Sequence, residues 1–247
     1  MDLLELGVNF FVTLFALTDP VGNIPIFAAA TATATAAQRR TIALYIALFA
    51  AFFMGFFYLT GLGLLEFFGI SLPAFRIAGG ILLFMLGLDM TRSDFMAHFA
   101  DPDADAAVPA GTAAGVEPGD TRAKRALVHA YARKRFERLI VPFGMPLLIG
   151  PGAISAVIIQ AGEANKLGPS GTAVGLAAIA ATGLAIMLAF WLTGPISRIL
   201  GKIGMAIVVR VLGLILCALA VQFIISGLGE TTHGIIRAAV ANPVSAH

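Results

Sequence analysis

Six apolar segments, each long enough to form a membrane-spanning helix, follow one another along the chain. They cover residues 3–30, 42–65, 73–90, 139–160, 173–193 and 205–228. A helix needs about 20 mostly apolar residues to cross roughly 30 Å of hydrocarbon. None of the segments alternates between apolar and polar residues, and their β-branched content is modest, so the pattern favours helices over a β-barrel. The sequence therefore predicts an all-α membrane protein with six transmembrane helices.

Two of these segments, the first and the fourth, are interrupted by proline and glycine. The interrupting residues are Pro20, Gly22 and Pro25 in the first segment, and Pro146, Gly150, Pro151 and Gly152 in the fourth. Proline removes a backbone donor and glycine tolerates unusual dihedral angles, so an ordinary helix cannot continue unchanged through either stretch. Freed backbone groups are tolerated at membrane depth only beside protein or a water-filled cavity. We expect helices 1 and 4 to be broken at mid-membrane, with Pro20, Pro25, Pro146 and Pro151 as hinge residues next to a cavity.

The two halves of the chain resemble each other. Residues 76–82 match residues 210–216 at an offset of 134, and Pro20 corresponds to Pro151 at an offset of 131. Three spans in each half give the two halves opposite orientations, which is an inverted repeat as found in secondary transporters. We predict a first three-helix repeat at 1–93, a loop at 94–138, a second repeat at 139–229 and a tail at 230–247.

Composition and charge fix the environment and the orientation. The chain is 59% hydrophobic and only 12% charged, against about 25% charged in soluble domains. With six spans, twelve Lys and Arg fall in the loops on one side and two on the other side, which holds both termini. The positive-inside rule then makes the first side cytoplasmic. For a bacterial inner membrane protein this places both termini in the periplasm.

The loop at 94–138 combines two kinds of sequence. Its first part is acidic and rich in Pro, Gly and Ala, which is typical of disordered segments. Residues 121–138 contain seven Lys and Arg among Leu127, Val128, Tyr131 and Phe136, which suits a basic amphipathic helix on the cytoplasmic membrane surface. Because this run adjoins a span, membrane lipid is the expected partner and nucleic acid is not.

The two breaks also suggest a binding site. A half-helix that restarts at mid-depth offers free N–H groups and about half a positive charge, which suits a carboxylate. We expect such starts near Asn23 and Ala153, with Asp19 holding an ammonium group, a proton or a monovalent cation. A zwitterion with both charges is an amino acid, and the glycines would admit a small one. The candidate substrate-binding residues are Thr18, Asp19, Gly22, Asn23, Gly150, Gly152, Ala153 and Ser155.

Other chemistry has little support in the residues. The chain has one cysteine, Cys217, within an apolar run, and its four histidines show no metal-ligand spacing. It contains no HExxH, no phosphate-binding loop and no nucleophile with an obvious base. We therefore expect no cofactor, no metal site and no enzymatic activity. The residues leave open whether the protein forms a homo-oligomer.

The interrupted segments and the third span resemble those of the MarC family of integral membrane proteins. The matching residues are 14–17 and 19–25, then 75–84 and 88–90, then Pro142, Pro146 and 150–154. The resemblance covers nearly all of the chain outside 94–138. It implies a six-span inner-membrane protein similar to carriers of small neutral amino acids such as glycine and alanine. Many members have Asn at the position of Asp19, and their central loop is shorter.

These observations favour a secondary transporter of small neutral amino acids, an importer or an exporter, linked to protons and alternating access around the two broken helices. A small-solute channel is the main alternative, because some channels also place two half-helices tip to tip at mid-depth. A membrane regulator without transport activity is the other alternative, with the basic helix as its contact surface.

Overall fold

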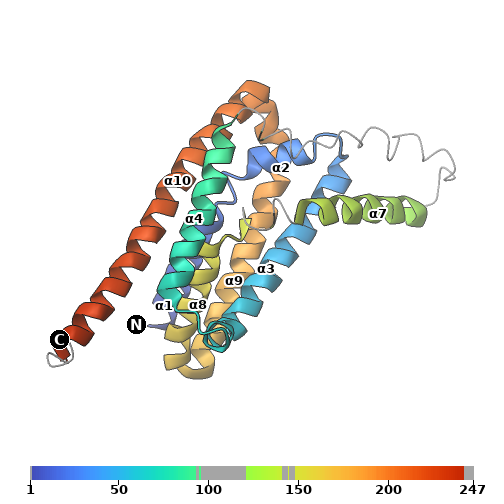
Figure 1. Ribbon diagram of the computed structural model, residues 1–247. Helices are drawn as coiled ribbons and strands as arrows, with labels where there is room; N and C mark the ends of the chain where they lie inside the picture. Colours follow the sequence, from blue (N-terminus) through green and yellow to red (C-terminus); the bar gives the residue numbers. More distant parts are fainter. Residues whose placement is uncertain (1, 93–94, 96–120, 141–143, 145–147, 242–247) are drawn as a thin grey trace.

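The computed structural model describes residues 2–92, 95, 121–140, 144, 148–150 and 151–241. The regular elements in this part of the chain are helices (Figure 1). They are α1 (Leu3–Thr18), α2 (Ile24–Ala30), α3 (Ala36–Phe67), α4 (Leu72–Thr91), α7 (Thr121–Leu139), α8 (Pro151–Lys166), α9 (Gly168–Trp191) and α10 (Thr193–Ala241). The all-helical prediction is confirmed. The acidic stretch predicted at 96–120, the residues 242–247 of the tail and the predicted hinge Pro146 lie outside the described residues.

Four of the helices are long and apolar enough to cross a membrane: α3, α4, α9 and residues 203–232 of α10. The predicted second, third, fifth and sixth spans fall on these four helices. The first predicted span is divided between α1, a shorter apolar helix of 16 residues, and the 7-residue α2. The second half of the predicted fourth span is α8, also of 16 residues.

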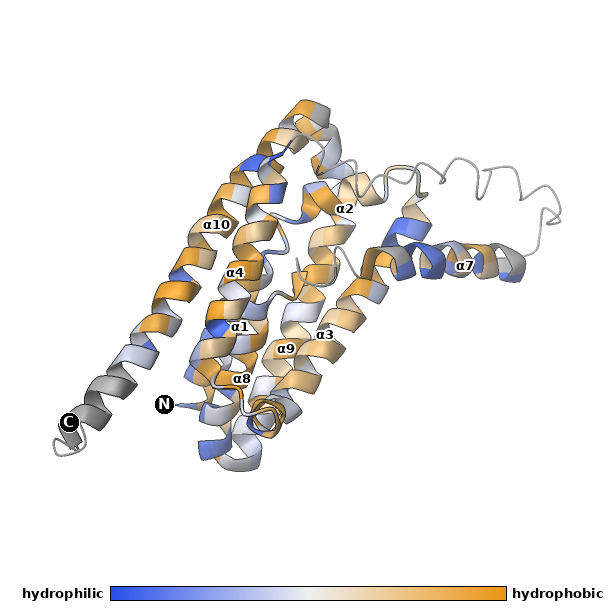
Figure 2. Ribbon diagram, viewed as in Figure 1, coloured by the Kyte–Doolittle hydropathy of each residue, from blue (hydrophilic) through white to orange (hydrophobic). Residues whose placement is uncertain are grey.

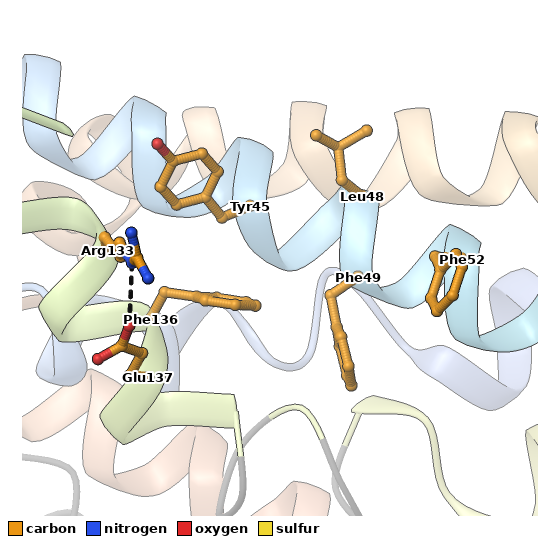
Figure 3. A pocket seen from close by; sticks show the side chains of 7 residues that line it. All are labelled: Tyr45, Leu48, Phe49, Phe52, Arg133, Phe136 and Glu137. Atoms are coloured by element: carbon orange, nitrogen blue, oxygen red, sulfur yellow. Dashed lines mark hydrogen bonds and ion pairs between the residues drawn. The ribbon is translucent and has the colours of Figure 1, made fainter.

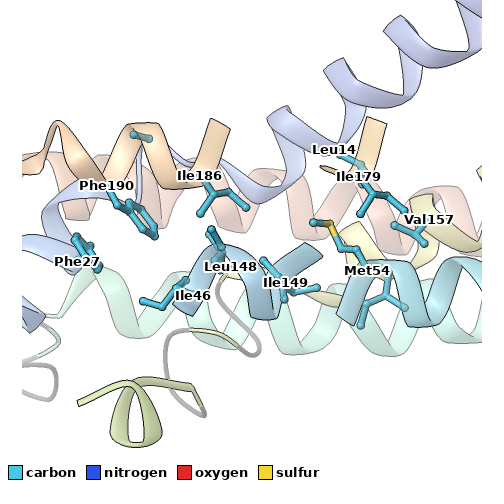
Figure 4. Close-up of a cluster of buried hydrophobic side chains, with 14 of the residues drawn as sticks. Leu14, Phe27, Ile46, Met54, Leu148, Ile149, Val157, Ile179, Ile186 and Phe190 are labelled. Atoms are coloured by element: carbon cyan, nitrogen blue, oxygen red, sulfur yellow. The ribbon is translucent and has the colours of Figure 1, made fainter. Parts of the chain in front are cut away.

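The centre of the molecule is formed by the antiparallel packing of α3 and α9, with α1 and α8 beside them (Figure 1). A Cβ at Gly183 of α9 would lie 3.1 Å from the Cβ of Ala51 in α3, so the two helices touch through small residues there. Phe27 of α2 stacks on Phe190 of α9, with ring centroids 4.4 Å apart. Figure 4 shows the apolar cluster at this centre. Its labelled members are Leu14, Phe27, Ile46, Met54, Leu148, Ile149, Val157, Ile179, Ile186 and Phe190.

Helices α4 and α10 form a second, tightly packed antiparallel pair on one side of this centre (Figure 1). Their backbones approach closely at Gly80 and Gly87 of α4 and at Gly213 and Gly227 of α10. A Cβ at Gly80 would lie 2.8 Å from the carbonyl oxygen of Ala220, and one at Gly213 would lie 2.7 Å from that of Gly87. Gly80 and Gly87 are seven residues apart and Gly213 and Gly227 are fourteen apart, and both spacings put the two glycines on one face of their helix. Small residues that let helix backbones touch are the usual basis of packing in membranes.

The outward faces of the bundle are apolar (Figure 2). Large exposed hydrophobic side chains occur on α3, α4, α9 and α10, among them Phe52, Met85, Leu184 and Ile207. A water-soluble protein does not expose so much contiguous apolar surface. These faces fit a hydrocarbon environment.

The basic segment forms α7, as predicted, and it projects from the bundle at a steep angle to α3 (Figure 1). It is also anchored by specific contacts. The Nε of Arg135, which is buried, donates to the carbonyl oxygen of Ala30 at 2.7 Å. The hydroxyl of Tyr45 in α3 lies 2.9 Å from Nδ1 of His129. Arg135 therefore connects α7 to the last turn of α2, where carbonyl groups have no partner within the helix.

Candidate functional site

The first break is organised by Asp19. Helix α1 ends at this residue, whose φ of 38° lies in the left-handed region, and the backbone then turns through Pro20. Oδ1 of Asp19 accepts a hydrogen bond from the N–H of Gly22 at 3.1 Å. A Cβ at Gly22 would overlap the other carboxylate oxygen and lie 2.6 Å from Cδ2 of Leu212. Glycine is therefore required for the turn to fold back against the carboxylate.

Asn23 closes the same break from the other side. Its Nδ2 donates to the carbonyl oxygens of Thr18 and Asp19, both at 3.0 Å. Both carbonyls lie at the end of α1, and that of Asp19 also accepts from the backbone N–H of Asn23 at 3.1 Å. The Oδ1 of Asn23 accepts no hydrogen bond from the described residues. The amide nitrogen thus holds the break together, and the amide oxygen remains as an acceptor.

A cavity of about 330 Å³ lies beside these two residues. Asp19 and Asn23 are its polar members, and apolar side chains of α1, α4 and α10 form the rest. The lining residues are Ala16, Leu17, Asp19, Asn23, Met90, Leu212, Ile215, Leu216 and Leu219. An acid and an amide oxygen in a small apolar cavity can bind a group that donates several hydrogen bonds and carries positive charge, such as an ammonium.

The second break is packed tightly. Gly150 is the N-cap of α8, and the helix begins at Pro151, two residues before the predicted start at Ala153. Proline is well suited to the first position of a helix because its missing N–H would have no partner there. Pro151 packs against Gly79 of α4, and a Cβ at Gly152 would lie 2.5 Å from Cε2 of Phe223 in α10. The start of α8 is thus covered by α4 and α10.

The two predicted hydroxyl contacts differ. The hydroxyl of Thr18 is buried and donates to the carbonyl of Leu14 at 2.8 Å, within its own helix. Ser155, in the second turn of α8, is also buried, but its Oγ has no hydrogen-bond partner among the residues that the structure describes. A buried polar group without a partner is uncommon and calls for an explanation. Of the two, Ser155 has hydrogen-bonding capacity left for a ligand.

The structure therefore gathers some of the predicted site residues and separates others. Asp19 and Asn23 line one cavity, with Gly22 forming the turn that holds Asp19. Among the described residues, those from α8 do not line this cavity: Gly150, Gly152, Ala153 and Ser155 lie at the covered second break. Sequence reasoning missed Met90 and the α10 residues Leu212, Ile215, Leu216 and Leu219. Met90 lies in a stretch that carries the resemblance, and three of the others lie in the internal repeat. The sequence still does not distinguish an apolar side chain that faces a cavity from one that faces lipid.

No group of three or more His, Cys, Asp or Glu residues that could hold a metal ion occurs in the part of the chain that the structure describes. The polar residues at the first break are one acid and one amide, which is too few ligands for a dedicated metal site.

The two breaks and the third span are the stretches that carry the resemblance stated from the sequence, and the structure places them among membrane-length helices. The model of the MarC family of integral membrane proteins matches residues 4–108 and 116–232. The chain belongs to the MarC family. As a MarC protein it is an integral membrane protein, and the match includes both breaks and both helices of the α4–α10 pair.

Relatives of this MarC protein occur in archaea and bacteria. It is 31% identical to a UPF0056 membrane protein of Methanocaldococcus jannaschii over 92% of this chain and 98% of the relative. It is 31% identical to the UPF0056 membrane protein YhcE of Escherichia coli, over 93% of this chain and 94% of that protein. The UPF0056 membrane protein YvbG of Bacillus subtilis is 29% identical over 90% and 93%. No solved structure gives a significant match.

Proposed function

We propose that this MarC protein is a secondary transporter of small neutral amino acids such as glycine and alanine, linked to protons. It acts in the inner membrane of a bacterium, with six spans and both termini in the periplasm. No cofactor or metal takes part, and the protein has no enzymatic activity. The proposal rests mainly on one observation: Asp19 and Asn23 line a small cavity at the break of a helix that lies among membrane-length helices.

The side chains that line the cavity are complementary to the ammonium group of such a substrate. Asp19 supplies negative charge, and Oδ1 of Asn23 supplies a neutral acceptor. A charged residue at membrane depth is costly and usually functional. The apolar walls of the cavity and its volume of about 330 Å³ limit the substrate to a small molecule. Among the described residues that line it, the cavity has no basic side chain that could pair with a carboxylate.

The carboxylate half of the site is proposed to be the start of α8. Its first N–H groups lie at a break, and the unpartnered hydroxyl of Ser155 is in the following turn. Phe223 and Gly79 cover this region in the present conformation. We propose that the α4–α10 pair shifts against the rest of the bundle, so that the cavity extends from Asp19 to the start of α8.

The pattern of helix contacts supports the inverted repeat behind this mechanism. Exchanging spans 1, 2 and 3 for spans 4, 5 and 6 turns the contact of α2 with α10 into that of α8 with α4. The contact of α1 with α9 becomes that of α8 with α3, and the pairs α3–α9, α4–α10 and α1–α8 map onto themselves. The contact of α8 with α9 has no comparable counterpart between span 1 and α3 among the described residues. The first break is open to a cavity, whereas its counterpart is covered. Such asymmetry between equivalent halves is expected of one state in an alternating-access cycle.

The test is counterflow of glycine and alanine in proteoliposomes, comparing the native protein with Asp19→Asn. Asparagine keeps the size and the oxygen that accepts from Gly22, so the turn is preserved while the charge is lost. We expect saturable counterflow in the native protein, a response to an imposed proton gradient, and a rate about tenfold lower in the variant, the size of a lost charge-assisted hydrogen bond. The gradient response should disappear in Asp19→Asn.

A matched control is Asp89→Asn, which removes an acid that is exposed at the end of α4 and pairs with Arg92. It should transport as the native protein does. Saturable counterflow that is unchanged in Asp19→Asn would leave a carrier but remove Asp19 from its chemistry. Linear flux without saturation would indicate a channel. Absence of flux for both amino acids would leave the regulator as the better explanation.

A further inference from the structure

The junction between α7 and α3 contains a groove that the proposed transport does not use. Its volume is about 430 Å³, and it opens to the outside of the molecule (Figure 3). The groove is lined by Tyr45, Leu48, Phe49 and Phe52 of α3 and by Arg133, Phe136 and Glu137 of α7. Figure 3 shows the apolar side chains along α3 and the two charged residues at the α7 end.

The groove lies where a membrane surface should cross the molecule. Helix α3 has 32 residues and is about 48 Å long, so it exceeds the roughly 30 Å hydrocarbon layer. Its N-terminal turns contain Arg39 and Arg40, and continuous apolar sequence begins directly after them. The groove begins at Tyr45, little more than one turn further on. Leu48 and Phe52, which are 58% and 73% exposed, point away from the bundle toward the hydrocarbon.

The polar end of the groove is suited to a phosphate. Nε of Arg133 donates to Oε1 of Glu137 at 3.1 Å, and the Arg133 side chain is 79% exposed. This single bond leaves the four N–H groups of the two terminal nitrogens without a partner among the described residues. Helix α7 contains seven Lys and Arg residues against one Glu. The helix as a whole therefore attracts negative charge, by about 1 kcal/mol for each basic residue near an anionic membrane surface.

The pair of Arg133 and Glu137 also keeps the arginine over the groove. The hydroxyl of Tyr45, which also lines the groove, lies at hydrogen-bond distance from Nδ1 of His129. The rings of Phe49 and Phe136 meet edge to face, with centroids 6.0 Å apart, and form a fixed wall on one side. The groove is thus preformed and apolar, with a guanidinium group at one end.

From these features we propose that the α3–α7 groove binds one anionic phospholipid. Its phosphate pairs with Arg133, and one acyl chain lies along Leu48, Phe49 and Phe52. The inference is independent of what the protein transports. It gives α7 a definite role, which is to form a lipid site together with α3 at the membrane surface.

The test is native mass spectrometry of the full-length protein in detergent, titrated separately with phosphatidylglycerol, phosphatidylethanolamine and phosphatidylcholine. We expect the first to bind about tenfold more tightly than the other two, because only it adds net negative charge. Arg133→Gln should lower the affinity for phosphatidylglycerol to that of phosphatidylcholine. The matched control is Lys134→Gln, which removes the same charge from an exposed neighbour that does not line the groove, and it should bind like the native protein.

A second variant, Leu48→Trp, tests the apolar part of the site by filling the groove. It should weaken the binding of phosphatidylglycerol without any change in charge. Equal binding of the three lipids would overturn the proposal, as would equal losses in Arg133→Gln and Lys134→Gln. Binding of phosphatidylethanolamine as tight as that of phosphatidylglycerol would also overturn it, because the site would then not select net negative charge. If Arg133→Gln does not fold, undiminished binding in Leu48→Trp is sufficient to reject the site.

Discussion

At the first break, some atoms of Asp19 and Asn23 hold the backbone in place, and others remain available to a ligand. The sequence indicated that both Asp19 and Asn23 would face a substrate, because both are polar in an apolar span. The structure shows that the Asn23 amide nitrogen is occupied by the carbonyls of Thr18 and Asp19, and that one Asp19 oxygen caps the turn at Gly22. Such roles depend on where a side chain points after the backbone turns. A sequence pattern locates the turn but does not give that direction.

The role of the Asn23 amide gives a prediction about stability. Asn23→Asp replaces the donating NH₂ with an oxygen that faces two carbonyl oxygens. Both carbonyls lose the side-chain hydrogen bond, although that of Asp19 keeps the backbone N–H of Asn23. Leaving a buried acceptor without a partner costs about 1–3 kcal/mol, and repulsion between the oxygens adds to this cost. We expect a lower midpoint of thermal unfolding in detergent. Asn165→Asp, at an exposed residue near the end of α8, is the matched control and should leave the midpoint unchanged.

If Asn23→Asp had the same midpoint of thermal unfolding as the native protein, the amide nitrogen would not stabilise the break. Asn23 would then be a residue whose main contacts are with the ligand. Measurement of unfolding in the presence and absence of glycine would show this, since a ligand contact changes the difference between the two midpoints.

At the scale of helices, the sequence predicted where elements end better than which elements meet. The end of α1, the start of α2 at Ile24 and the basic helix α7 follow from proline, glycine and charge, which act locally. The close pairing of α4 with α10 had no such signal. All faces of a membrane helix are apolar, so hydrophobicity does not distinguish the face toward a neighbour from the face toward lipid. The glycines spaced by seven residues in α4 and by fourteen in α10 were visible, but their role depends on which helix packs against them.

Packing between α4 and α8 gives the prediction at this scale. A Cβ at Gly79 would overlap the ring of Pro151, the first residue of α8. Gly79→Ala should force the two helices apart and reduce stability by about 1–3 kcal/mol, the usual range for overpacking. Gly55→Ala is the matched control, because a Cβ at Gly55 of α3 meets no atom within 4 Å. Thermal unfolding of both variants in the same detergent makes the comparison.

An equal midpoint of unfolding for Gly79→Ala and the native protein would mean that α4 and α8 can separate without a loss of stability. That result would contradict the tight cover of the second break on which the proposed asymmetry between the two halves depends.

For the whole molecule, the arrangement of the spans in the membrane connects the charges of the sequence with the helices of the structure. The turn between α3 and α4 and the turn between α8 and α9 lie at the same end of the bundle, whereas α7 extends from near the opposite end (Figure 1). The sequence places the basic residues at the α7 end. The bundle and the charge distribution therefore agree on which loops share a side.

This agreement predicts the outcome of cysteine labelling in intact cells. In a Cys217→Ala background, single cysteines are placed at Ile70, Lys166 and Arg125, which are all exposed. With six spans, two crossings separate residues 70 and 166, and one separates either from residue 125. A membrane-impermeant maleimide should label the first two cysteines from outside and Arg125→Cys only after permeabilisation, which also serves as the control for reactivity.

If only α3, α4, α9 and α10 crossed the membrane, one crossing would separate residues 70 and 166, and they would react from opposite sides. Labelling of Ile70→Cys and Lys166→Cys from opposite sides would therefore exclude the inverted repeat, and with it the alternation of the two breaks.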